Sequence, residues 1–180
     1  MEPEFSVFEV LEIAEEVEHK AAKFYLRVAE RFADEQRRNL HYSLAAWRAR
    51  HERAWARIRR EYSDRTGDLG TFDPDDYLLS NPQTMAGLTS FGSDPDSRNV
   101  PRGHETEEQI VHDAIRRSQD VSIFYDGLKT FARDTESRIM IDGMISEENR
   151  HIRLLLRALS RMQETSGNRA KHPSRFRTTV

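Results

Sequence analysis

Residues 24–51 read FYLRVAERFADEQRRNLHYSLAAWRARH, and residues 124–151 read FYDGLKTFARDTESRIMIDGMISEENRH. Laid over itself with an offset of 100 residues, the chain matches without a gap at Phe24-Tyr25 and Phe124-Tyr125, at Asp34 and Asp134, and at Arg50-His51 and Arg150-His151. Self-similarity at a fixed spacing indicates a duplicated structural unit. The sequence therefore predicts two copies of one helix pair, so that equivalent positions in the two copies can be compared.

Four amphipathic helices account for the two copies. Apolar residues at spacings of three and four predict helices over about residues 6–32, 34–62, 106–131 and 134–162. Ser6 and Thr106 each begin a capping box, and Asp34 and Asp134 are suitable N-caps for the second helix of each pair. Only a short turn separates the helices of a pair, which favours antiparallel packing.

The segment that joins the pairs, about residues 63–104, lacks helical periodicity and holds four prolines and five glycines. Two antiparallel hairpins joined by a long crossover are the connectivity of an all-α, ferritin-like four-helix bundle. We therefore predict one domain over residues 1–163, followed by a basic, disordered tail over residues 164–180. The apolar residues of the crossover, Tyr77, Leu78, Leu79 and Phe91, are expected to pack on their own chain.

Composition excludes several classes of function. The chain has 180 residues, a net charge of −3 and no cysteine. With this small negative net charge, the chain as a whole has no large positive potential that would attract nucleic acid. The absence of cysteine excludes disulfides, thiolate metal sites and a cysteine nucleophile. No stretch has the ~20 apolar residues of a membrane span, so we expect a cytoplasmic protein without nucleic-acid or membrane partners.

Four polar residues lie on helix faces that the periodicity predicts to be buried: Glu18, His51, Glu148 and His151. Glu148 and His151 are three residues apart, so both side chains leave the same face of a helix. The offset of 100 residues makes His51 the equivalent of His151. The coincidence of these positions points to a metal site in the centre of the bundle.

Residues 6–162 resemble the rubrerythrin branch of the ferritin-like family, in which a Glu, an aromatic pair and a Glu-x-x-His motif occur twice. The matching pieces are Glu18 followed by Phe24-Tyr25, His51, Phe124-Tyr125, and Glu148-Asn-Arg-His151. The resemblance implies two irons held between four helices, used for peroxide reduction or ferrous iron oxidation.

Two expected ligand positions depart from the family pattern. Arg48 stands at the Glu of the first Glu-x-x-His motif, and Ser118 stands where the third helix presents a carboxylate. Because buried charge needs compensation, the remaining carboxylates are too few for two irons. The acids close by in sequence do not repair the site: Glu52, Glu147, Asp113 and Asp120 lie off the inner faces, and Glu15, one turn before Glu18, has an isoleucine, Ile115, as its equivalent in the other copy.

Two hypotheses remain open. In the first, Glu18, His51, Glu148 and His151 bind one iron or manganese, with zinc also suited to the ligands, and the protein is an oxidoreductase with an external electron donor. In the second, Arg48 pairs with Glu148 or Glu18 in place of the metal, and the protein is a non-catalytic oligomeric scaffold. Large aromatic residues on one side of the second helix, Trp47 and Trp55, suit either the packing between helices of the bundle or the contact of a homodimer, and we expect a homodimer.

Overall fold

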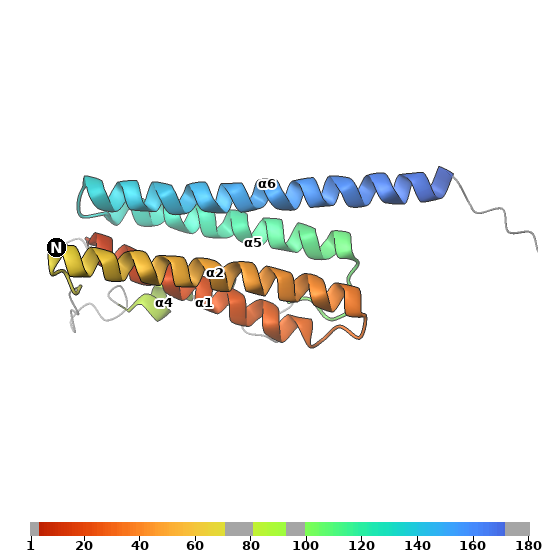
Figure 1. Ribbon diagram of the computed structural model, residues 1–180, viewed down its shortest axis with the longest axis horizontal. Helices are drawn as coiled ribbons and strands as arrows, with labels where there is room; N and C mark the ends of the chain where they lie inside the picture. Colours follow the sequence, from red (N-terminus) through yellow and green to blue (C-terminus); the bar gives the residue numbers. More distant parts are fainter. Residues whose placement is uncertain (1–3, 71–80, 93–99, 172–180) are drawn as a thin grey trace, which may run out of the picture.

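The computed structural model describes residues 4–70, 81–92 and 100–171. Within these ranges the chain is all-helical and has no β-strand (Figure 1). The four long helices are α1 (Val7–Ala29), α2 (Glu35–Thr66), α5 (Glu107–Leu128) and α6 (Thr135–Lys171). A short helix α4 (Pro82–Ala86) lies between α2 and α5, and a 3-10 turn (Lys129–Phe131) follows α5. The all-α class predicted from the sequence is confirmed.

Side-chain caps fix the beginnings of the helices. The Ser6 hydroxyl accepts a hydrogen bond from the N–H of Glu9, whose carboxylate accepts one from the Ser6 N–H, and Thr106 forms the same capping box on α5. Asp34 accepts from the backbone N–H of Arg37 at the beginning of α2. These starting points agree with the sequence prediction because capping is a short-range interaction.

The ends of the helices differ more from prediction. Helix α2 continues to Thr66 and stops at Gly67, whose φ of 74° is a left-handed conformation that glycine adopts without a Cβ clash. Helix α6 continues to Lys171, beyond the predicted end near Met162. Helix α4 was not predicted, because five residues are too few to show periodicity; Asn81 caps it and Pro82 begins it.

The order of the helices in space positions the site. Helix α1 packs along α2 and α5 packs along α6, while α1 also contacts α6 and α2 contacts α5. Helix α2 ends at the end of the molecule where α1 begins, whereas α5 begins at the opposite end (Figure 1). The connection between α2 and α5 therefore leaves α2 at one end of the molecule and reaches α5 at the opposite end (Figure 1).

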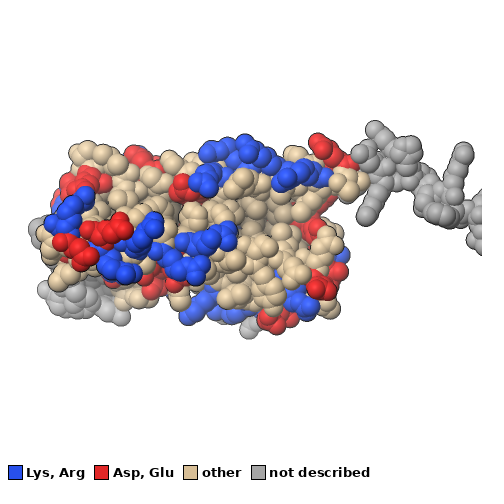
Figure 2. All heavy atoms as spheres, in the orientation of Figure 1, with Lys and Arg blue, Asp and Glu red and all other residues tan. Residues whose placement is uncertain are grey.

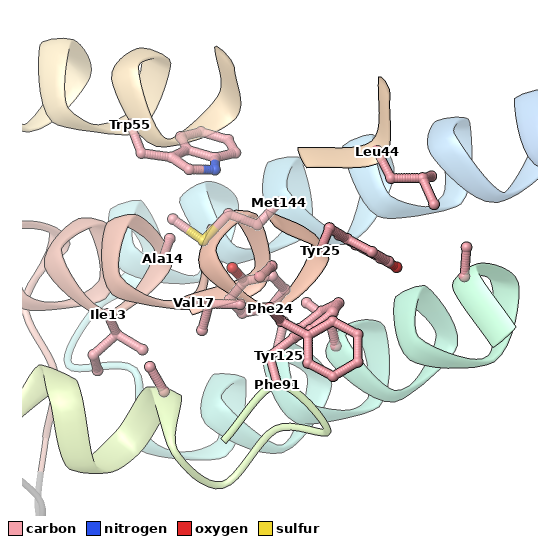
Figure 3. Packing of buried hydrophobic residues seen from close by; sticks show 14 of the residues in the cluster. Ile13, Ala14, Val17, Phe24, Tyr25, Leu44, Trp55, Phe91, Tyr125 and Met144 are labelled. Atoms are coloured by element: carbon pink, nitrogen blue, oxygen red, sulfur yellow. The ribbon is translucent and has the colours of Figure 1, made fainter. Parts of the chain in front are cut away.

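Apolar side chains fill the interior between the helices. Figure 3 shows Val17, Phe24 and Tyr25 of α1 close to Tyr125 of α5 and to Phe91 of the connection. Phe91 is buried, and its ring packs edge-on against both Phe24 and Tyr25 with centroid distances of 5.6 Å. The expectation that Phe91 packs on its own chain is confirmed, while Tyr77, Leu78 and Leu79 lie outside the described residues.

Candidate functional site

Arg48 of α2 lies fully buried in the middle of the helices. Its Nη1 donates to Oε2 of Glu18 on α1 at 3.2 Å and to Oε1 of Glu148 on α6. Its Nη2 donates to Oε2 of Glu148 at 3.2 Å and to Oγ of Ser118 on α5 at 2.8 Å. The guanidinium thus forms a bidentate hydrogen bond with Glu148 through both of its terminal nitrogens, and its contacts join all four long helices.

Arg48 and its three partners form two pairs of equivalent positions in the duplicated halves. Glu18 is equivalent to Ser118, and Arg48 is equivalent to Glu148, because each pair is separated by 100 residues. The sequence prediction that Arg48 pairs with Glu148 or Glu18 is confirmed, since it contacts both carboxylates. The duplication therefore brings one guanidinium, two carboxylates and one hydroxyl to a single point inside the molecule.

This centre holds one positive group against two carboxylates. Burial and, more weakly, the charge of Glu148 raise the pKa of Glu18 to about 8, although the nearby Arg48 opposes the rise. Burial alone would lower the pKa of Arg48, but the carboxylates of Glu148 and Glu18 outweigh it and raise that pKa. Arg48 therefore stays charged, and of the two acids that face it Glu18 has the raised pKa.

Two buried tyrosines, Tyr25 and Tyr125, flank the centre. Neither hydroxyl has a hydrogen-bond partner among the described residues. Burial raises the pKa of both phenols, and for Tyr125 the charges of Glu18 and Glu148 raise it further. Both side chains are therefore neutral and serve as packing groups, as the sequence predicts for the aromatic pairs.

The two histidines lie on either side of an indole ring. Trp47 stacks against His51 with ring centroids 3.9 Å apart and against His151 with ring centroids 3.6 Å apart. Nδ1 of His151 is buried and has no hydrogen-bond partner among the described residues. Burial, reinforced by the positive charge of Arg48, lowers the pKa of His151 to about 2, so this imidazole is neutral.

The arrangement separates the four residues predicted to bind metal. Glu18 and Glu148 face Arg48, whereas His51 and His151 face Trp47. Across the described ranges, no three His, Asp or Glu side chains lie together in a way that would hold a metal ion. In this arrangement the residues do not fit the iron or manganese that the family resemblance implies, and no chemistry is assigned to one.

The neighbouring acids have partners of their own. Glu15 pairs with Arg59 at 2.8 Å, and Glu147 pairs with Arg150 at 3.5 Å. Glu52 contacts the ring nitrogen Nδ1 of His19 at 2.9 Å. Asp113 pairs with Arg117 at 2.8 Å. Asp120 accepts a hydrogen bond from the backbone N–H of Ser90. None of these contacts adds a carboxylate to the centre, in agreement with the sequence analysis.

Sequence reasoning missed a second buried arginine, Arg117 of α5. Its Nη1 donates to the backbone oxygen of Ser90 at 2.6 Å, and its guanidinium lies 4.0 Å from the centre of the Phe24 ring. Together with Asp120, it binds both backbone groups of Ser90 and so holds the connection against α5. The spacing of Asp113 and Arg117, four residues on a helix, was the available signal for a paired arginine.

The fold and this centre define an all-helical protein built around a buried arginine–carboxylate cluster. Comparison of the chain with protein-family models, with curated proteins and with solved structures gives no match. None of the helices within the described ranges has the length and apolar character needed to cross a membrane.

Proposed function

We propose that the protein is a non-catalytic, metal-free scaffold with a ferritin-like four-helix bundle, in which Arg48 takes the place of the metal. The observation that carries this proposal is the contact of one buried guanidinium with Glu18, Ser118 and Glu148. The helix directions and the long return connection support two antiparallel hairpins joined by a crossover, as in such bundles (Figure 1).

The charge balance of the centre supports a structural role. A metal bound by Glu18 and Glu148 would have to displace the guanidinium, which would then need another buried partner for its charge. Both carboxylates already use oxygens on Arg48. The arrangement instead ties four helices together through charge-assisted hydrogen bonds, which fixes their register without supplying a reactive group.

The two tryptophans that suggest a homodimer in the sequence, Trp47 and Trp55, contact residues of their own chain in this fold. Trp55 is buried within the chain, and Trp47 is covered on both faces by histidines. Trp47 is half-buried, so these two rings leave little free apolar surface for a partner, and the homodimer is not part of the proposal.

Metal content per chain tests the proposal. Protein purified without an affinity tag or chelator, and measured by element-resolved mass spectrometry, is expected to hold far less than one iron, manganese or zinc per chain. The Arg48→Glu variant, which removes the guanidinium and adds a carboxylate, is expected to gain metal. Arg50→Glu, an equal change of charge at the exposed residue two positions away, should leave the metal content unchanged.

Close to one metal per chain in the parent protein would overturn the proposal and support an oxidoreductase with an external electron donor. A second readout covers the case in which Arg48→Glu folds poorly. Because a ligand of the folded state raises apparent stability, a chelator would lower the unfolding temperature of a metal-bound parent protein. The proposal requires the parent's unfolding temperature to be the same with and without chelator.

A further inference from the structure

The duplication also repeats a set of exposed arginines. Each of the two copies carries three at the same spacing: Arg50, Arg53 and Arg57 on α2, and Arg150, Arg153 and Arg157 on α6. All six side chains are exposed. Positions separated by three and seven residues fall on one face of a helix, so each set forms a row along its helix. We call these six residues the arginine band.

The two rows meet near the middle of the molecule. Arg50 and Arg150 directly precede His51 and His151, whose rings lie on opposite sides of Trp47. Helices α2 and α6 run in opposite directions, so the rows extend away from this point toward opposite ends of the molecule (Figure 1). Figure 2 shows basic side chains over both helices on the same face. The band is therefore long and narrow.

Most guanidiniums of the band are available for a partner. Two weak contacts at the surface involve it, between Arg57 and Glu61 at 3.8 Å and between Arg150 and Glu147 at 3.5 Å. Arg50, Arg53, Arg153 and Arg157 form no ion pair with a described residue. The net charge of −3 thus coexists with two rows of exposed arginines on one face.

We infer that the arginine band binds the phosphate backbone of a nucleic acid, without reading its base sequence. Successive arginines of a row are about 4.5 and 6 Å apart along the helix axis, so each can reach a different phosphate of a strand that carries a charge every ~3.4 Å. The band is made entirely of arginine, whose planar guanidinium can bind phosphate with two parallel hydrogen bonds.

A lipid surface fits the band less well than a nucleic acid. A helix that lies in a membrane interface presents an apolar face to the lipid. The main apolar faces of α2 and α6 point inward instead, with Leu44, Trp55, Ile141 and Met144 buried, and the exposed large apolar residues of α6 are the scattered Ile139, Leu154 and Leu156. The net charge of the whole chain disfavours nucleic acid, but the six arginines of the band lie in two rows at exposed positions of α2 and α6. The inference goes beyond the scaffold role and does not depend on Arg48.

Fluorescence anisotropy with a labelled DNA duplex of ~20 base pairs, about two helical turns, tests the inference. The parent protein should bind at about 50 mM salt, with an affinity that falls linearly on a double-logarithmic plot against salt concentration. The triple variant Arg53→Gln, Arg153→Gln, Arg157→Gln should bind at least about tenfold more weakly at this salt, and the slope should decrease in magnitude by about 3.

A matched variant carries the same change of charge outside the band: Arg27→Gln, Arg102→Gln, Arg138→Gln, all at exposed positions. Its affinity should stay within about twofold of the parent, and thermal unfolding should be alike for all three proteins. Equal weakening by both variants, or no salt-dependent binding by the parent, would overturn the inference. Binding to phosphatidylserine vesicles without binding to DNA would also overturn it and make a lipid surface the partner.

Discussion

Arg48 shows at the scale of one residue how a buried ion pair differs from an exposed one. Its guanidinium and the carboxylates of Glu18 and Glu148 are removed from water together, so each compensates the desolvation of the others. The sequence places an arginine at this position and two acids on facing helices. That Arg48 contacts both acids and Ser118 depends on how closely the four helices approach.

Removing only Arg48 should be severe. In Arg48→Met, two buried carboxylates lose their partner, so the free energy of unfolding should fall by about 3–5 kcal/mol in urea denaturation. The triple variant Arg48→Met, Glu18→Leu, Glu148→Leu should recover most of this loss, because no buried charge remains. Arg50→Met, at an exposed neighbour, should change stability by less than about 0.5 kcal/mol. A mild effect of Arg48→Met alone would contradict this account.

The histidines show the limit of residue-level prediction. The periodicity correctly predicts that His151 is buried and makes it the equivalent of His51. It cannot predict that Trp47, which is four residues before His51 on α2, also stacks against His151 of α6. A contact between two helices depends on how they pack and is not encoded in the spacing along either one.

At the scale of elements, the connection is held to α5 by the backbone of Ser90. The N–H of Ser90 donates to Asp120, and its carbonyl accepts from Arg117. Phe91, the next residue, then fills the space beside Phe24 and Tyr25. A segment that lacks helical periodicity thereby becomes part of the core, since both backbone groups of Ser90 are satisfied by side chains.

Breaking this attachment should loosen the connection selectively. In Arg117→Met, the Ser90 carbonyl loses its buried donor, which should lower the free energy of unfolding by about 1–3 kcal/mol. Hydrogen exchange measured by mass spectrometry should rise in the peptide that covers residues 85–92. Arg116→Met is a suitable control, because Arg116 is exposed and pairs with the same Asp113. Unchanged exchange in that peptide would show that Ser90 is held by other contacts.

The helix boundaries show which element-level features are local. All four long helices and the caps at Ser6, Asp34 and Thr106 agree with prediction, because capping and amphipathic periodicity act within a few residues. The ends of α2 and α6 were predicted too early. At the end of α2, residues 64–66 are exposed and carry no buried stripe, so periodicity fades there before the backbone stops being helical.

At the scale of the whole molecule, two buried groups give stability opposite dependences on pH. The pKa of Glu18 is raised from 4.5 to about 8, so folding is favoured at low pH and loses stability as pH rises through this window. The pKa of His151 is lowered from 6.5 to about 2, so folding loses stability as pH falls below 6.5. Between pH 4.5 and 6.5 the two effects oppose each other.

We therefore expect the free energy of unfolding to be highest near pH 4.5–6.5 and to fall on both sides, with each group contributing up to about 1.4 kcal/mol per pH unit. Urea denaturation across the pH range measures this profile. Glu18→Gln should remove the fall above pH 6.5, and His151→Phe should reduce the fall below pH 4.5 while keeping a ring against Trp47. An alkaline slope that persists in Glu18→Gln would exclude Glu18 as its source.

By itself, the sequence determined the all-helical class, the duplication, the starts of the four long helices and the presence of Arg48 among buried carboxylates. These features follow from interactions between residues close in the chain and from a repeat that can be read directly. Only the tertiary structure decided that Arg48 contacts both Glu18 and Glu148, that Trp47 lies between His51 and His151, and that Arg117 holds Ser90. The physical reason is that charge pairing and ring stacking depend on distances between helices, which the packing of the whole chain sets.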